Sequence, residues 1–296
     1  MTVGIDDLST DATSIPRAWR SPGVVWRSLR LWQVRAGLAM VAVVAGISLL
    51  GPAFAPHGET EFVGRPNTRN VEGLVFGTDY LGQDVLSRFL LGGWPIVLSA
   101  VLATGLGVVI GAALGLVAAL TPGRLDQVVM RSIDVVLAVP QFLLVLVAMT
   151  TIGPRPWLIV VAVALTTAPR VARVTRGAAV TVVERDFVAV SRALGESRWH
   201  IARADVVPNV SGPLLVEANI RLTYAIGIVA SLAFLGFTPN VNAANWGLMV
   251  QENRAALATQ PWGVVLPTCA IALLAIGTGL VADGVARTIA GIDRAS

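Results

Sequence analysis

The most informative stretch of the chain is polar and rich in arginine, and it reads Glu184-Arg185-Asp186-Phe187-Val188-Ala189-Val190-Ser191-Arg192-Ala193-Leu194-Gly195 and then, after a gap, Val206-Val207-Pro208-Asn209. Pro208 follows Gly195 by thirteen residues, and apolar stretches flank the whole segment on both sides. A charged residue at the centre of a membrane helix costs about 2.5–3.5 kcal/mol on the insertion scale. The segment is therefore expected to form a loop with a short helix outside the bilayer.

The composition is that of a polytopic membrane protein. The 296 residues are 55% hydrophobic and only 14% charged, with a mean hydropathy of +0.73, whereas soluble domains carry about 25% charged residues. All 22 basic residues are arginine. They flank apolar stretches, as expected for residues that orient membrane helices. Since no basic face is interleaved with stacking aromatic residues, nucleic-acid binding is disfavoured. The single cysteine, Cys269, excludes a disulfide within the chain.

A membrane helix needs about 20 mostly apolar residues. Six stretches qualify, at residues 36–55, 95–120, 133–152, 157–176, 214–237 and 263–282. The first follows a long polar lead, and it is longer than the roughly 7–15 apolar residues of a signal peptide, so we interpret it as a retained span. Pro169, Arg170 and Arg173 cut into the end of the fourth. The sequence predicts an all-α membrane protein with six transmembrane helices.

Two charged residues near the start of the fifth span require a partner. Glu217 and Arg221 are four residues apart, which places them on one helix face in the favourable acid-first order. We expect them to form a structural ion pair, and the alternative is a transport gate.

The arginines also orient the spans. Sixteen of them fall in the N-terminal segment, in 121–132, in 170–213 and in the C-terminal tail, against five on the other side, with Arg221 at an interface. This asymmetry predicts that both termini are cytoplasmic. The expected organisation is a cytoplasmic segment (1–35), the first transmembrane helix (36–55), an extracytoplasmic loop (56–94), a five-helix core (95–285) with the cytoplasmic loop 177–213, and a cytoplasmic tail (286–296).

The long outer loop ends in an ordered stretch. Thr78 or Asp79 is expected to cap a short helix, residues 85–91, which has apolar residues on one side and lies on the outer membrane surface. In the second outer loop, 238–262, Trp246 and Trp262 are expected to be interfacial anchors.

Catalytic motifs are missing from the sequence. A phosphate-binding P-loop requires lysine, and the chain has none, so we expect no ATPase site of its own and no catalytic residue. His57 and His200 lie far apart, and no metal or other cofactor is expected. Asp79 and Asp84 are expected to cap helices rather than to act as a carboxylate pair. The acids at span positions, Asp134, Glu217 and Asp283, lie near span ends, which argues against an ion-coupled carrier.

The opening stretch resembles the coupling loop of prokaryotic ABC importer permeases, whose pattern is Glu-Ala-Ala, three residues, Gly, and a distant Ile-x-Leu-Pro. The matching residues are Ala189, Val190 and Ser191, then Gly195, then Val206, Val207 and Pro208. Ala189 stands where the family usually has Glu. The resemblance implies that residues 189–195, with Arg192, Ala193 and Leu194, meet a separate ATPase. Gly195 would allow a left-handed turn or a close backbone approach, and Pro208 would stop the chain before the next span.

A second stretch narrows the resemblance to dipeptide and oligopeptide permeases. Residues 77–88 are similar to their Gly-Thr-Asp-x-x-Gly-Arg-Asp-Val-Leu-Ser-Arg segment, in which Gly77, Thr78, Asp79, Gly82, Asp84 and Arg88 match and only Gln83 departs. Further similar pieces, all within about 75–290, are 131–134, 231–237, Trp246-Gly247, Pro261-Trp262, Pro267 and Asp283-Gly284.

The family implies a type I ABC importer fold and four kinds of partner. These are a homologous second permease, one or two ATPase subunits, an extracytoplasmic substrate-binding protein, and membrane lipids. Two alternatives stay open: a permease of the same fold for nickel or another small solute, and a self-sufficient secondary carrier.

Overall fold

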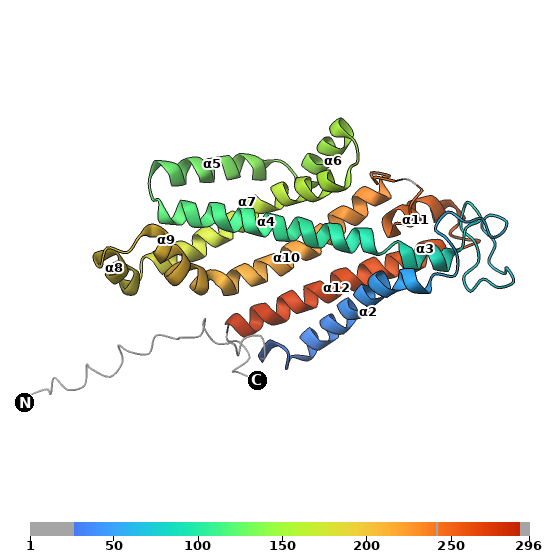
Figure 1. The fold of residues 1–296 in the computed structure, drawn as a ribbon, viewed down its shortest axis with the longest axis horizontal. Helices are drawn as coiled ribbons and strands as arrows, with labels where there is room; N and C mark the ends of the chain where they lie inside the picture. Colours follow the sequence, from blue (N-terminus) through green and yellow to red (C-terminus); the bar gives the residue numbers. More distant parts are fainter. Residues whose placement is uncertain (1–26, 241, 291–296) are drawn as a thin grey trace, which may run out of the picture.

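The computed structural model describes residues 27–240 and 242–290, so the expectations for residues 1–26 and 291–296 lie outside the described part of the chain. This part is helical apart from two isolated β-bridges (Figure 1). Its helices are α2 (Trp32–Phe54), α3 (Val85–Leu91), α4 (Trp94–Leu120), α5 (Arg124–Ala138), α6 (Gln141–Ile152), α7 (Pro156–Val183), α8 (Asp186–Ala193), α9 (Arg198–His200), α10 (Val207–Phe234), α11 (Trp246–Asn253) and α12 (Trp262–Ala290).

Among the described residues, five helical runs are long and apolar enough to cross a membrane, and the number rises to six if the bent pair of α5 and α6 counts as one span. The all-α membrane fold is therefore confirmed, although the third and fourth spans differ from the expectation. Residues 133–152 were expected to form one continuous helix, but α5 and α6 meet at a bend of 80°. Pro140 explains the break, because the residue before a proline is driven out of the helical region, and Val139 is extended.

The fourth span differs in the opposite sense. Pro169 was expected to cut its end, but α7 continues through this residue for 28 residues as the most buried of the candidate spans. Its arginines are held by the neighbouring helices. Arg176 forms two bonds of 2.5 and 2.6 Å to Asp126, Arg173 lies 2.5 Å from Asp134, and Arg170 lies 2.5 Å from the amide oxygen of Gln141. These three polar contacts attach α5 and α6 to α7.

Close packing of α4 on α7 rests on three glycines spaced four residues apart. A Cβ at Gly107, Gly111 or Gly115 would lie 2.9, 2.5 or 2.5 Å from a backbone carbonyl oxygen of α7. Small residues at this spacing let two helix backbones approach, and in lipid this close packing drives helix association. Hydrogen atoms at these positions therefore set the distance between the two central helices.

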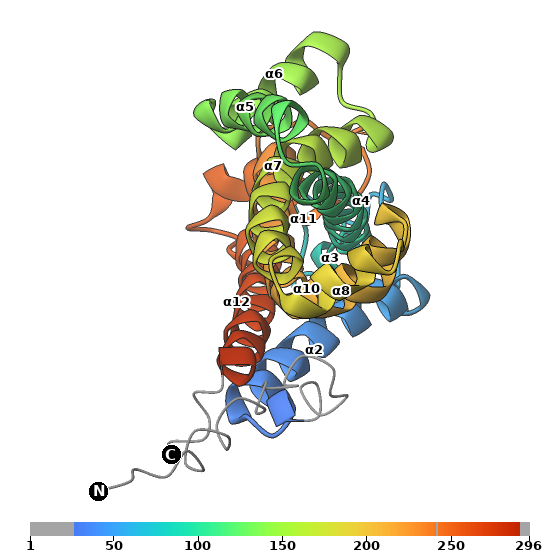
Figure 2. The same cartoon turned by 90° about the vertical axis from the view of Figure 1, so that its left-hand side faces the viewer.

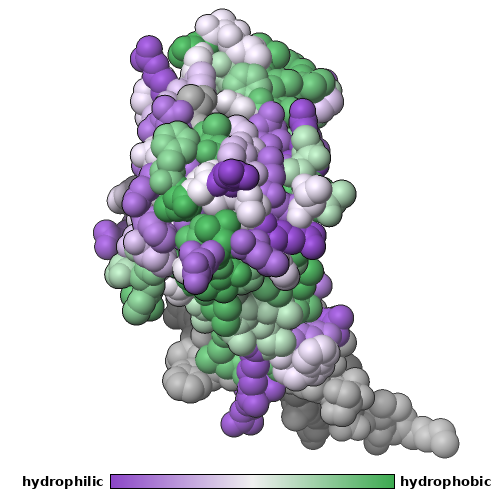
Figure 3. Space-filling view, turned by 90° about the vertical axis from the view of Figure 1, so that its right-hand side faces the viewer, coloured by the Kyte–Doolittle hydropathy of each residue, from purple (hydrophilic) through white to green (hydrophobic). Residues whose placement is uncertain are grey.

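The connections divide between two ends of the bundle. The start of α2, the α4–α5 turn, the segment with α8 and α9, and the end of α12 lie at one end (Figures 1 and 2). The loop 55–84, α3 and α11 lie at the other. Figure 3 looks onto this second end, where hydrophilic residues are mixed with apolar ones. The two stretches that the sequence analysis singled out thus lie about one helix length apart.

Candidate functional site

The first candidate site is the segment between α7 and α10. One side chain, Val188, anchors α8: it is fully buried against Val182, Ile201 and Val206. The rest of α8 points outward, including Ala189, Arg192 and Ala193. A short helix fixed by one apolar side chain has its remaining surface available to another protein.

The end of α8 is set by Gly195, whose φ of +82° lies in the left-handed region. Its N–H donates to the Arg192 carbonyl, and the N–H of Glu196 donates to the Ser191 carbonyl, which closes the helix end. No atom lies within 4 Å of a Cβ placed on Gly195. Of the two roles open to this glycine, the structure therefore shows the left-handed turn and, among residues 27–240 and 242–290, no close approach.

Three apolar side chains stand out on the segment. Val190 is 56% exposed, Leu194 79% and Trp199 75%. Large apolar side chains on an otherwise polar loop are typical of a protein-binding surface. We call Val190, Leu194 and Trp199 the apolar row.

The return to the membrane helix differs from the expectation. Pro208 does not stop the chain: α9, a π-helical turn (Ile201–Val206) and α10 form one continuous run, and Pro208 lies in the first turn of α10. In the π-helical turn the N–H of Val207 reaches back five residues to Ala202. This wider turn lies just before Pro208, which has no N–H of its own to donate. Val206 is fully buried, whereas Val207 is 40% exposed.

The second candidate site is a buried polar cluster at the opposite end. Arg88, only 1% exposed, lies 2.5 Å from Asp79 and 3.1 Å from Glu252. Glu252 also accepts a bond of 3.0 Å from the Tyr80 hydroxyl, and Asn253 accepts one of 3.0 Å from the Tyr80 N–H. The cluster, which we call the arginine clamp, joins α3 to α11 across more than 160 residues of sequence.

Burial shifts the acid groups of the clamp. It raises the pKa of the Glu252 carboxyl above its usual value, although the Arg88 guanidinium acts in the opposite direction. Burial and the hydrogen bond to Glu252 raise the pKa of the Tyr80 hydroxyl to about 12. The Arg88 guanidinium thus faces the carboxyl groups of Asp79 and Glu252. The raised pKa means that the Glu252 carboxyl takes up a proton more readily than an exposed glutamate does.

Asp84, not Thr78 or Asp79, caps α3. Its carboxylate accepts the N–H groups of Leu86 and Ser87 and the Ser87 hydroxyl, with the His57 ring at 3.3 Å. Asp79 instead accepts the N–H groups of Leu81 and Gln83, while Thr78 donates to the Arg65 carbonyl at 2.5 Å. The short helix was predicted at the correct residues. It also packs against α2 and α12 and buries Val85 and Phe89, and its position at the membrane surface stays a prediction.

Two glycines make this cluster possible. Gly77 and Gly82 have φ of +72° and +84°. A Cβ at either would lie within 2.3 Å of a carbonyl oxygen, that of Thr68 for Gly77 and that of Gly64 for Gly82. Both positions of the predicted motif therefore require glycine for a turn and for space.

Several residues of the cluster could not be predicted from the sequence. Gln260 donates from its amide to the carbonyls of Phe76 and Thr78, at 2.7 and 3.1 Å. Trp246, expected as an interfacial anchor, is fully buried, and its ring N–H donates to the Phe89 carbonyl at 2.8 Å. Glu252, Asn253 and Gln260 carry no local motif, because their partners lie more than 160 residues away. Trp262, 39% exposed, stacks at an angle on Phe76.

The described part of the chain is a bundle of long apolar helices with a short exposed helix at one end and an ordered polar cluster at the other. This architecture is that of a multi-pass membrane protein. Residues 107–291 match the family described as "Binding-protein-dependent transport system inner membrane component", and the chain belongs to this family. It is a permease component of an ABC importer, a class that works with other ABC transporter subunits.

Curated relatives agree on this class. The chain is 32% identical to the probable D,D-dipeptide transport system permease protein DdpC of Escherichia coli K12, over 71% of this chain and 70% of the relative. It is 32% identical to the peptide transport system permease protein SapC of Escherichia coli O6:H1, over 93% and 97%. The identity to the di/tripeptide transport system permease protein DppC of Pseudomonas aeruginosa is 31%, over 84% of each chain.

A solved structure shares the fold. An inward-facing form of the MetNI methionine ABC transporter aligns with a TM-score of 0.53 and 19% identity, and the alignment covers 69% of this chain and 96% of that chain. Residues 27–106, with α2, α3 and the first half of α4, precede the part matched by the family.

Proposed function

We propose that this chain is one of two homologous permease subunits of an importer for di- or oligopeptides. One or two separate ATPases drive it, and an extracytoplasmic binding protein delivers the substrate. The observation that carries the proposal is the apolar row of Val190, Leu194 and Trp199 on a segment outside the membrane helices. The proposed substrate class is supported by curated relatives that are named as peptide permeases and that align with this chain over most of their length.

The apolar row accounts for the coupling to ATP hydrolysis. Residues 189–195 meet a groove on the ATPase, while buried Val188 and Val206 hold the segment against α7 and α10. When the ATPases close on ATP, their grooves move, and the segment moves with them. Because α9, the π-helical turn and α10 are continuous, a displacement of the segment passes directly into a membrane helix. ATP binding thereby biases a two-state membrane domain.

The proposed orientation places α8 in the cytoplasm and the arginine clamp on the outer side. Reporter fusions after residues 125 and 190 should report the inner side, and fusions after 65, 155 and 250 the outer side. An outward report at 190 would contradict the coupling role. The purified chain alone is expected to hydrolyse no ATP, because it has no lysine for a phosphate loop.

The experiment that tests the function combines assembly with uptake. The chain is produced with its second permease, ATPases and binding protein, and uptake of a dipeptide, an oligopeptide and nickel is measured. Leu194→Arg and Trp199→Arg should weaken co-purification of the ATPase and reduce uptake in step. Leu125→Arg is the matched control, since Leu125 is a 50% exposed leucine at the same end of the bundle. Equal effects of the three variants would exclude a role of the apolar row in binding the ATPase. Nickel uptake without peptide uptake would exclude peptides as the substrate.

A further inference from the structure

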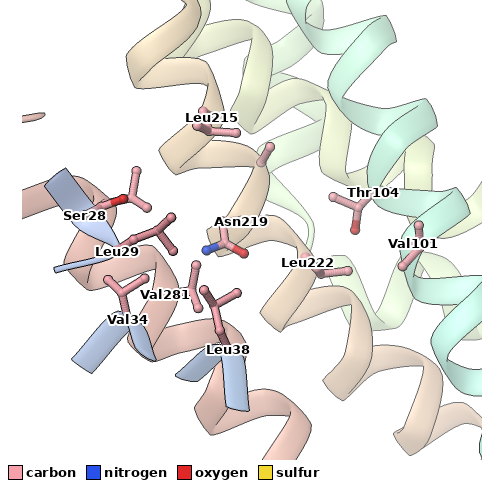
Figure 4. A pocket seen from close by; sticks show the side chains of 12 residues that line it. Ser28, Leu29, Val34, Leu38, Val101, Thr104, Leu215, Asn219, Leu222 and Val281 are labelled. Atoms are coloured by element: carbon pink, nitrogen blue, oxygen red, sulfur yellow. The ribbon is translucent and has the colours of Figure 1, made fainter. Parts of the chain in front are cut away.

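A cavity of about 490 Å³ lies between two pairs of helices. Val34 and Leu38 of α2 and Val281 of α12 form one wall, and Leu215 and Leu222 of α10 face them (Figure 4). Helix α2 packs mainly on α12, whereas α4 packs on α7 and α10, so α2 and α4 make little contact with each other. The cavity occupies the space that this arrangement leaves open.

The chemistry of the walls is almost entirely apolar. Leucine and valine dominate, and the polar side chains among the lining residues are Ser28, Thr104 and Asn219. The amide of Asn219 already donates to the Thr278 carbonyl at 3.3 Å. The lining part of α10, from Leu215 to Leu222, rises about 10 Å, which fits within the roughly 15 Å depth of one leaflet. A flexible hydrocarbon chain suits these walls.

Arginines stand at one mouth of the cavity. Arg27 and Arg30, which precede α2, and Arg35 in its first turn are exposed, and they flank the lining residues Ser28, Leu29 and Val34 in the sequence. The Nε of Arg35 donates to the carbonyl of Leu29 at 2.8 Å, which fixes its guanidinium beside a residue of the cavity wall.

Acidic groups of the lining helices do not offset these charges. Glu217 is engaged with Arg221 at 2.8 Å. Asp283 lies two residues from both Val281 and Val285, and therefore on the other face of α12.

We propose that the cavity is a binding site for an anionic phospholipid of the leaflet on the α2-start side. One acyl chain lies between α2, α10 and α12, and Arg35, with Arg27 and Arg30, holds the phosphate. Each buried methylene group contributes to binding, and guanidinium groups favour phosphate through charge-assisted hydrogen bonds. The lipid fills the space between α2 and the core and so fixes the position of the first membrane helix.

The test is photo-crosslinking of the full chain, both alone and in the assembled transporter. Nanodiscs contain phosphatidylcholine with a minor fraction of phosphatidylglycerol that carries a photoactivatable acyl chain, and the labelled peptides are identified by mass spectrometry. A parallel sample carries the same probe on phosphatidylcholine. The expected result is label concentrated on residues 28–38, 215–222 and 281–285, and stronger for phosphatidylglycerol.

Matched variants separate this site from general lipid contact. Arg35→Gln should lower phosphatidylglycerol label in the cavity about fivefold, the equivalent of about 1 kcal/mol for one basic residue at an anionic surface. Arg124→Gln, an exposed arginine at the same end, should leave it unchanged. Ala218→Trp should fill the cavity and abolish the label, whereas Ala113→Trp on the exposed side of α4 should not.

Three results would overturn the proposal. The first is that the residues lining the cavity are labelled no more strongly than the exposed face of α4. The second is equal label from phosphatidylglycerol and phosphatidylcholine with Arg35 intact, which would show that the site does not select an anionic headgroup. The third is label in the isolated chain that disappears in the transporter, which would assign the cavity to the second permease subunit.

Discussion

Arg88 of α3 lies 3.1 Å from Glu252 of α11, although 164 residues separate them, and both side chains are almost fully buried. This contact ties the segment before the second membrane helix to the segment before the last. It makes the segments around α3 and α11 one ordered unit at the end of the bundle opposite to α8.

The buried arginine is expected to be essential for the order of this end. Arg88→Gln leaves Asp79 and Glu252 buried without their guanidinium, and breaking a buried pair costs about 3–5 kcal/mol. We expect a lower midpoint of thermal unfolding in detergent and faster proteolysis between residues 55 and 84. Arg69→Gln, on an exposed arginine of the same segment, is the control. Equal stability of the two variants would show that the clamp contributes nothing.

The clamp is also expected to respond to pH through Glu252. Because burial raises the pKa of this carboxyl in the folded state, the folded protein binds a proton more tightly than the unfolded chain does. The contribution of Glu252 to stability therefore increases as pH falls through its folded-state pKa. Unfolding midpoints measured from about pH 7 to about pH 5 should show this rise, relative to Glu252→Gln, in which the group cannot titrate. Parallel curves for both proteins would assign the pH response to other groups.

The glycine spacing on α4 predicts a sharp contrast between two identical substitutions. Gly111→Val places side-chain atoms against the Ala168 carbonyl and Val171, and overpacking of this kind costs about 1–3 kcal/mol. A Cβ at Gly105, on the same helix, would meet none of the described atoms of other segments within 4 Å, so Gly105→Val is the matched control. Membrane abundance and thermal stability should fall for Gly111→Val alone. Similar losses in both would mean that helix propensity, not contact with α7, is responsible.

The left-handed turn at Gly195 predicts that the backbone, not space, limits substitution there. Asn tolerates this conformation, whereas Val, which is β-branched, does not. We expect Gly195→Asn to retain ATPase binding and uptake, and Gly195→Val to lose much of both at normal membrane abundance. The strain is about 1–2 kcal/mol, enough to change the direction in which α8 ends. A reversed order of the two variants would point to contact with the partner instead.

Much of the fold could be predicted because hydrophobic length and arginine placement are local properties of the sequence. Residues 95–120 and 263–282 lie within α4 and α12, and the short helix 85–91 matches α3. The ion pair of Glu217 with Arg221, 2.8 Å apart, follows from helical spacing alone. The third span could not be predicted correctly, since whether Pro140 bends or ends a helix depends on the contacts of Gln141 with α7.

Composition and short-range patterns are enough to predict the membrane class, the apolar stretches and the short helix 85–91, because these are local properties of the chain. Their surroundings depend on tertiary contacts. In the folded bundle, Trp246 is buried, Asp84 caps α3, and Glu252 and Gln260 contact residues between 76 and 88. Helix α10 continues back through the π-helical turn to α9. These features depend on groups far apart in the chain, whose hydrogen bonds and close packing exist only once the helices have assembled.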